Sequence, residues 1–90
     1  MAYRVEFTTA ATREIRKLRK SIQPKLMKSI SGRINGLAAD PRPPGAEKLE
    51  GYEYWRVRAG DYRIVYSIED ELLTVLVIKI GNRRDIYEGL

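Results

Sequence analysis

The residues with the clearest chemical potential are the arginines within residues 54–66, Tyr-Trp-Arg-Val-Arg-Ala-Gly-Asp-Tyr-Arg-Ile-Val-Tyr. Gly60-Asp61 is typical of a two-residue hairpin turn, because glycine readily adopts the positive φ that the first turn position needs. This register places Arg58 directly opposite Arg63, with Arg56 on the same face of the hairpin. Like charges at a cross-strand pair are destabilising, and a bound anion relieves that repulsion. The pattern therefore predicts an anion-binding face, and the alternative is a basic face that is simply solvated.

The other face of the predicted hairpin is apolar. In the same register its cross-strand pairs are Ala59 with Tyr62, Val57 with Ile64, and Trp55 with Tyr66. A strand face of this kind packs against the core. We therefore expect Trp55, Tyr62 and Tyr66 to be core residues rather than binding residues.

A second group of candidate binding residues lies in residues 81–87, Gly-Asn-Arg-Arg-Asp-Ile-Tyr, directly after the most apolar run of the chain. Arg83 and Arg84 are predicted to flank the hairpin arginines. Arginine suits phosphate because its planar guanidinium donates two parallel hydrogen bonds and stays charged. Tyr54 and Tyr87 offer rings for stacking on bases, which is common in the recognition of single-stranded RNA.

Length and composition restrict the possible functions. Ninety residues suit a single domain, residues 1–90, with a modest core. Seventeen Lys and Arg against twelve Asp and Glu give a net charge of +5, which suits a polyanionic partner. The chain has no cysteine and no histidine, so a metal site would have to rest on carboxylates and we predict none. No apolar run approaches the roughly 20 residues of a membrane span, and the N-terminus lacks a signal-peptide core, so we expect a cytoplasmic protein that does not contact a membrane.

The first half of the chain predicts one strand and two helices. Residues 3–7 alternate apolar and charged side chains, as in a strand with one buried face. Thr8 or Thr9 can cap a helix in which apolar residues recur at helical spacing over residues 11–22. Pro24 suits the first turn of a second helix, which is expected to end before Asp40-Pro41.

Two features of these helices invite a functional or a structural interpretation. Gly32 and Gly36 each cost a helix about 1 kcal/mol relative to alanine, so their spacing suggests a close approach of the two helices, with plain tolerance as the alternative. The first helix carries a basic face that includes Arg16, Lys17 and Lys20. This face is either solvated or in contact with phosphates.

The second half predicts a sheet. Three prolines make residues 40–45 a loop, and residues 46–50 are expected to form a short strand before the arginine hairpin. After a turn at residues 69–71, residues 72–80 are apolar at nearly every position, which is typical of a central strand. Short turns make the last three strands antiparallel. The predicted fold class is α+β, with an N-terminal strand and a helix hairpin packed on one face of a mainly antiparallel sheet, leaving the arginine face open.

Taken together, these motifs resemble the RelE branch of the RelE/ParE toxin superfamily, and the resemblance covers almost the whole chain. The motifs that carry it are Lys48-Leu49-Glu50-Gly51, Trp55-Arg56-Val57-Arg58, residues 60–66 and residues 81–87. The resemblance implies a RelE-like fold and a toxin of a type II toxin-antitoxin system. Such toxins are ribosome-dependent endoribonucleases that cut messenger RNA in the A site, and a cognate antitoxin neutralises them.

The resemblance also implies which residues act. Carried over by position, the catalytic residues are Arg56, Arg58, Arg63, Arg83 and Tyr87. The implied reaction is attack of the ribose 2′-OH on the adjacent phosphate, without metal or cofactor. Residues predicted to bind RNA around this centre are Lys48, Tyr54, Arg84, Arg16, Lys17 and Lys20.

The sequence departs from well-known members at the general base. Arginine replaces lysine at positions 56 and 58, and no histidine is present. Deprotonating an arginine at pH 7 costs at least about 7 kcal/mol, whereas a phenol needs only about 4 kcal/mol. Arg56 is therefore better interpreted as a clamp on the 2′-OH and phosphate, and the base remains open between Tyr87, Lys48, Lys79 and the ribosomal RNA.

Two alternative functions remain on the same fold. The first is a ParE-like toxin that inhibits DNA gyrase, and the second is an inactive homologue that acts with its antitoxin in operon repression. The expected partners are an acidic, RelB-like antitoxin that wraps the basic surface, the ribosome and messenger RNA. We also expect the toxin-antitoxin complex to bind operator DNA through the antitoxin.

Overall fold

The computed structural model describes residues 2–90, which form two helices on one face of a five-stranded sheet. The strand order is β1-β5-β4-β3-β2, with β1 parallel to β5 and all other neighbours antiparallel. The strands are β1 (Arg4–Phe7), β2 (Glu47–Lys48), β3 (Trp55–Ala59), β4 (Tyr62–Glu69) and β5 (Thr74–Asn82). A short 3₁₀ helix, Asp70–Leu72, connects β4 to β5. The predicted α+β fold class is confirmed.

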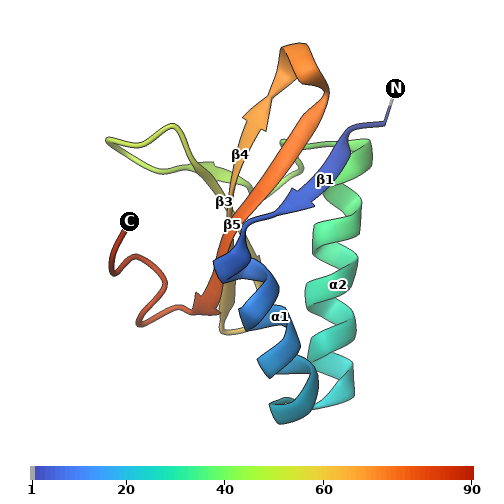
Figure 1. The fold of residues 1–90 in the computed structure, drawn as a ribbon, viewed down its shortest axis with the longest axis vertical. Coiled ribbons are helices and arrows are strands. Elements are labelled where there is room, and N and C mark those ends of the chain that lie inside the picture. The colour runs from blue at the N-terminus through green and yellow to red at the C-terminus, as the bar shows by residue number, and fades with distance from the viewer. Residues whose placement is uncertain (1) are drawn as a thin grey trace.

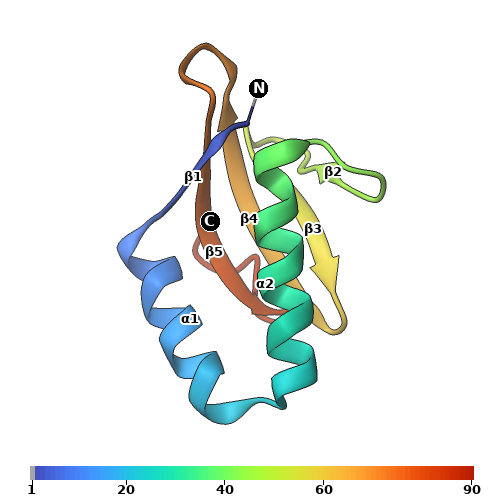
Figure 2. The ribbon, with the colours of Figure 1, turned by 90° about the vertical axis from the view of Figure 1, so that its right-hand side faces the viewer.

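The helices α1 (Thr9–Ser21) and α2 (Pro24–Ala39) form a hairpin that covers one face of the sheet (Figure 2). Thr8 is the N-cap of α1, and its hydroxyl accepts a hydrogen bond from the Ala11 amide (3.1 Å). The same hydroxyl donates to the carbonyl of Ile78 (2.7 Å), which ties the start of α1 to β5. None of the helices in residues 2–90 is long and apolar enough to cross a membrane.

The core lies between the helices and the sheet. Its buried residues include Ala11 and Leu18 of α1, the apolar stripe of α2, and alternate residues of the three long strands, namely Ile30, Ile34, Leu37, Val57, Ala59, Ile64, Tyr66, Val75, Val77 and Ile80. Trp55 and Tyr62 pack against this cluster, as predicted. The interpretation of Gly32 and Gly36 as points of close helix approach is wrong, because a Cβ at either position would meet nothing within 4 Å.

The hairpin register agrees with the sequence-based prediction at all five cross-strand pairs of β3 and β4, including Arg58 opposite Arg63. Gly60 begins the turn with φ +60°. Between β4 and β5 the register shifts, since Val65 pairs with Lys79 and Tyr66 with Val77. The extra residue on β5, Ile78, forms a bulge of the kind that bends and twists a strand.

Tyr66 is the largest fully buried side chain, and its hydroxyl donates to the carbonyl of Pro41 (2.7 Å). Burial raises the pKa of this phenol to about 12. Because the unfolded pKa is near 10, the stability that depends on the neutral phenol is fully present below pH 10 and is lost as the pH rises toward 12.

We predict that Tyr66→Phe lowers the unfolding free energy at pH 7 by about 1 to 3 kcal/mol, because the buried Pro41 carbonyl loses its donor. Between pH 10 and 12 the wild type should lose up to about 3 kcal/mol more than the variant. Urea unfolding at pH 7, 10 and 12 measures both effects. Parallel decreases in the two proteins above pH 10 would contradict the assigned ionisation.

Candidate functional site

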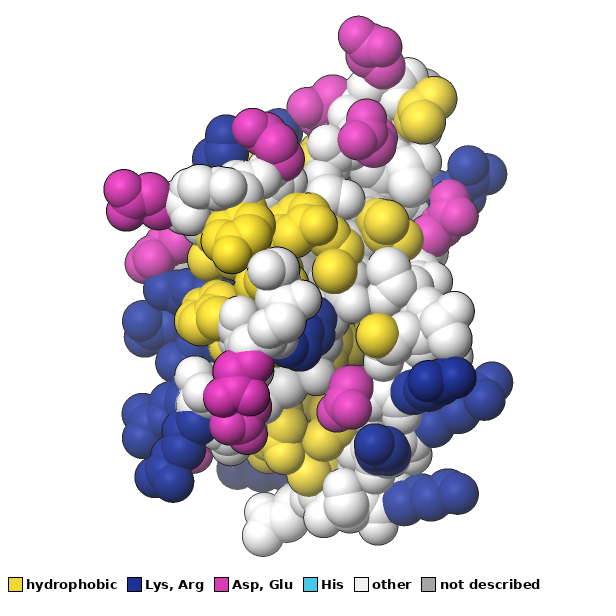
Figure 3. All heavy atoms as spheres, turned by 60° about the vertical axis from the view of Figure 1, so that its left-hand side comes forward, with side chains coloured by type: hydrophobic (Ala, Val, Ile, Leu, Met, Phe, Trp, Pro, Cys, Tyr) yellow, Lys and Arg dark blue, Asp and Glu magenta, His cyan; other side chains and the backbone are white. Residues whose placement is uncertain are grey.

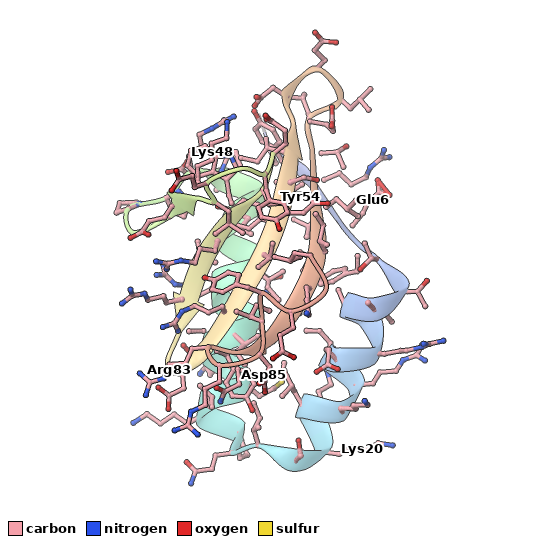
Figure 4. The ribbon with its side chains drawn as sticks, turned by 90° about the vertical axis from the view of Figure 1, so that its left-hand side faces the viewer. Glu6, Lys20, Lys48, Tyr54, Arg83 and Asp85 are labelled. Atoms are coloured by element: carbon pink, nitrogen blue, oxygen red, sulfur yellow. The ribbon has the colours of Figure 1, made fainter. Side chains whose placement is uncertain are left out.

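The candidate site lies on the face of the sheet that the helices do not cover (Figure 4). Side chains alternate along a strand, so the face opposite to core residues Val57 and Ala59 carries Arg56 and Arg58. Tyr54, immediately before β3, continues this row, and it lies in the middle of the face in Figure 4. The predicted segregation of arginine from the apolar face is therefore confirmed.

Arg56 is nearly buried, with 9% of its surface exposed. Its Nη2 lies 2.6 Å from Oε2 of Glu47, and the register pairs these two residues across β2 and β3. Nη1 is buried and has no hydrogen-bond partner within residues 2–90. Arg56 is thus held by the sheet and its carboxylate partner rather than projecting freely from the surface.

Arg58 and Arg63 lie at the turn end of the hairpin, one exposed and the other half-buried. Nη1 of Arg63 donates to the carbonyls of Gly60 and Tyr62, at 3.1 Å each. Those carbonyl dipoles draw the Arg63 guanidinium toward the turn, which eases its repulsion with Arg58. The two arginines are therefore neighbours with unused donors on an exposed edge.

Arg83 joins this end of the sheet from the C-terminal segment. Its amide donates to the carbonyl of Asp61 (2.8 Å), and its Nε lies 4.0 Å from Oδ1 of the same residue. Figure 4 shows Arg83 at the lower end of the face, with Asp85 nearby. The structure thus brings Arg58, Arg63 and Arg83 to one end of the sheet, around the hairpin turn.

The C-terminal segment, residues 83–90, lies over the sheet on the side opposite to the helices (Figure 1). Ile86 is fully buried, and Val65 beneath this face is also fully buried. Nζ of Lys79 donates to the carbonyl of Glu88, and the Tyr52 hydroxyl donates to the carbonyl of Leu90 (3.4 Å). The face predicted to be open is therefore covered in part.

The aromatic residues of this face form a group that sequence reasoning found only partly. The rings of Tyr52 and Tyr54 are stacked, with centroids 5.8 Å apart and an interplanar angle of 10°. Tyr52 and Tyr87 are each 44% exposed and line one small pocket. Tyr52 was missed, although its position two residues before Tyr54 was the available signal.

The remaining predicted RNA-binding residues are spread over several surfaces. Lys48 forms an ion pair with Glu53 (3.6 Å), and Arg84 is exposed beside Arg83. Lys17 borders a cleft of about 820 Å³ between α1 and the C-terminal segment. Arg16 instead lines a groove between α1 and α2, and Lys20 lies at the far end of α1 in Figure 4. The structure does not bring Arg16 and Lys20 to the arginine face.

The charge on this side of the molecule is polarised. Figure 3 shows hydrophobic side chains in the middle of the face and Lys and Arg side chains on both sides of its lower part, with acidic side chains between them. The side chains around its upper end are mainly acidic. The β4–β5 connection, with Glu69, Asp70 and Glu71, forms that upper end (Figure 1). Within residues 2–90 no group of three or more potential ligands is placed to hold a metal ion. The face suits a polyanion that approaches its turn end.

Comparison with known proteins identifies the family. Residues 5–87 match the family described as ParE toxin of type II toxin-antitoxin system, parDE. The chain belongs to the RelE/ParE toxin superfamily. It is 33% identical over 87 residues to toxin RelG of Mycobacterium tuberculosis, covering 97% of this chain and 98% of that protein. It is 34% identical over 87 residues to the mRNA interferase toxin RelE of Escherichia coli K12, covering 92% and 85%.

Solved structures of the superfamily share the fold. An archaeal RelE-RelB complex from Pyrococcus horikoshii matches with a TM-score of 0.75 at 25% identity, covering 92% of this chain and 97% of that one. The RelBE2 toxin-antitoxin complex from Mycobacterium tuberculosis matches with a TM-score of 0.72 at 27% identity, covering 92% and 100%. The chain is therefore a type II toxin with a RelE-like fold, as its motifs predicted.

Proposed function

We propose that this toxin is a ribosome-dependent endoribonuclease that cleaves messenger RNA in the A site and is neutralised by a cognate antitoxin. The observation that carries the proposal is the gathering of Arg58, Arg63 and Arg83 at the turn end of the sheet face that the helices do not cover. Such an arrangement of guanidinium donors suits a phosphate whose negative charge increases during reaction. Relatives named mRNA interferase RelE support this reaction class.

In the proposed reaction the ribose 2′-oxygen attacks the adjacent phosphorus and the bond from phosphorus to the 5′-oxygen breaks. The products are a 2′,3′-cyclic phosphate and a 5′-OH. The 2′-OH proton passes to a base, and the leaving 5′-oxygen receives a proton. Arg63 and Arg83 would stabilise the additional charge of the phosphorane-like transition state, and each such donor is worth about 3 to 4 kcal/mol. Arg58 would clamp a non-bridging phosphate oxygen.

The contribution of Arg56 differs from that of the other arginines. Its ion pair with Glu47 and its burial favour a role in holding the strand. Arg56 would clamp the 2′-OH or phosphate only where the substrate reaches its buried Nη1, which has no partner within residues 2–90. Tyr87 is an exposed phenol on the segment that carries Arg83. It is the protein base we favour, because a phenol is in general a far less costly base at pH 7 than an arginine. Lys48, Lys79 and the ribosomal RNA are the alternatives.

The partners follow from the charge of the surface. The residues that would contact RNA around the cleaved phosphate are Lys48, Tyr54, Arg84 and Lys17. The two residues away from the arginine face, Arg16 and Lys20, would contact the ribosome or RNA elsewhere. Structures of relatives contain RelE bound to RelB, which supports an antitoxin partner for this chain. An acidic segment that folds on binding would complement the net charge of +5. We expect that complex to bind operator DNA through the antitoxin.

The experiment is primer extension on a defined message in a purified translation system, with and without ribosomes. We expect cuts within A-site codons only when ribosomes are present. Strong cleavage of naked RNA would contradict ribosome dependence. No cuts from folded toxin that still binds its antitoxin would reject the nuclease activity and favour an inactive homologue that represses its operon.

A second candidate function is inhibition of DNA gyrase, which the ParE description of the matching family favours. A supercoiling assay with purified gyrase distinguishes the two candidates. Inhibition of supercoiling together with absence of ribosomal cuts would establish the second candidate. The arginine cluster favours the first, because a gyrase-binding surface does not require donors that converge on a phosphate.

A further inference from the structure

The proposed function leaves one aromatic residue of the site face without a role, Tyr52, which stacks on Tyr54. Tyr54 and Arg56 occupy successive positions on the same side of the β3 row, about 6.6 to 6.8 Å apart at the rise of a strand. Tyr52 stacks on Tyr54 with nearly parallel rings. The arginine row therefore continues into an aromatic platform.

The ring of Tyr52 is also a wall of a pocket of about 200 Å³, and Tyr87 contributes to the same pocket. Both tyrosines are 44% exposed, so each retains surface for a ligand. The volume lies below the range of about 300 to 1,000 Å³ of drug-sized sites. It therefore suits a single planar ring system.

The other residues that line the pocket indicate whether it suits a nucleobase or a phosphate. They are Leu49, Glu50 and Leu90. Among the described residues that line the pocket none is Lys or Arg, and the Glu50 carboxylate would repel a phosphate. Aromatic and aliphatic walls bind the faces of nucleobases without regard to charge, and a carboxylate at the rim can accept a hydrogen bond from a base amino group.

We propose that Tyr52, supported by Tyr54, is a base-stacking residue that holds one nucleobase of the RNA strand whose phosphate the arginines bind at the other end of β3. This inference rests on the proposed function for the identity of the ligand, a single-stranded RNA substrate. Tyr52 thereby sets the register of the RNA strand, because the position of the base in this pocket determines which phosphate reaches the arginine cluster. Its ring, rather than its hydroxyl, carries the role.

The test uses a fully 2′-deoxy trinucleotide that contains 2-aminopurine, whose fluorescence decreases on stacking. The missing 2′-OH prevents cleavage, so binding is measured apart from the reaction. We expect the wild type to quench the fluorescence and Tyr52→Ala to weaken binding roughly 5- to 150-fold, the equivalent of 1 to 3 kcal/mol of stacking. Phe7→Ala is the matched control, since Phe7 is similarly exposed (41%) but lines the groove between α1 and α2.

Tyr52→Phe distinguishes stacking from anchoring of the C-terminal segment. This variant keeps the ring and removes the hydroxyl that donates to the Leu90 carbonyl. Binding that stays within about twofold of wild type supports stacking, whereas a loss equal to that of Tyr52→Ala would overturn it. Absence of quenching by the wild type would also overturn the inference. Absence of quenching would not contradict the proposed cleavage of messenger RNA on the ribosome. Conversely, quenching by a toxin that does not cleave on the ribosome would reject the nuclease function and still support the base site.

Discussion

Replacing Arg83 by alanine is expected to reduce ribosome-dependent cleavage by about 10²- to 10³-fold, the usual loss when one donor to a developing negative charge is removed. The structure places Arg83 beside Asp61 at the hairpin turn. Its side chain is 57% exposed and makes only a long ionic contact of 4.0 Å with Asp61. The unfolding free energy should therefore change by less than about 0.5 kcal/mol.

Single-turnover primer extension on programmed ribosomes measures the cleavage rate, and urea unfolding measures stability. Arg4→Ala is the charge-matched control, because Arg4 is an exposed arginine on β1 that is paired with Glu6 (3.4 Å), away from the hairpin turn. It removes the same charge and should leave cleavage near the wild-type rate. A wild-type rate in Arg83→Ala would remove Arg83 from the proposed centre. Equal losses in both variants would show that net charge, not position, is responsible.

Glu47→Ala is expected to lower the unfolding free energy by about 1 to 3 kcal/mol, although Glu47 itself is largely exposed. The reason for this loss of stability is the ion-pair partner of Glu47, Arg56. Arg56 is nearly buried and already has one donor without an acceptor, so loss of the carboxylate leaves its charge uncompensated. The same change should slow cleavage, because Arg56 would no longer be held in one orientation.

The double variant Glu47→Ala, Arg56→Met tests this explanation. Replacing a buried ion pair by apolar side chains of similar volume is often neutral or stabilising, whereas breaking the pair is costly. Urea unfolding should therefore find the double variant more stable than Glu47→Ala. If both variants are equally unstable, the loss comes from the β2–β3 pairing rather than from the buried, uncompensated charge of Arg56. Cleavage should remain low in the double variant, since the guanidinium is absent.

The sequence by itself determined the parts of this protein that depend on local rules. A glycine turn and strict alternation were enough to pair Arg58 with Arg63, because a two-residue turn leaves only one register that buries the apolar face. Thr8 and Pro24 marked the starts of the helices, since each suits the unpaired amides of a first turn. The motifs that follow from these elements also identified the superfamily.

Only the tertiary structure decided the burial and the contacts of the site residues. Arg56 is held by Glu47 because the short β2 adds to the sheet edge beside it. Ile86 is buried because the C-terminal segment folds back onto β5, where a Cβ at Gly81 would lie 3.3 Å from Cδ1 of Ile86. A single apolar residue among polar neighbours has no periodicity that would predict this. Tyr52 reaches the site through its stack on Tyr54 and its contact with Leu90. These arrangements depend on contacts between segments far apart in the chain or on loop geometry. Residue type and local spacing determine neither long-range contacts nor loop geometry. They were therefore enough to place the arginines on one face of the sheet, but not to place the C-terminal segment that covers this face or the tyrosine stack beside it.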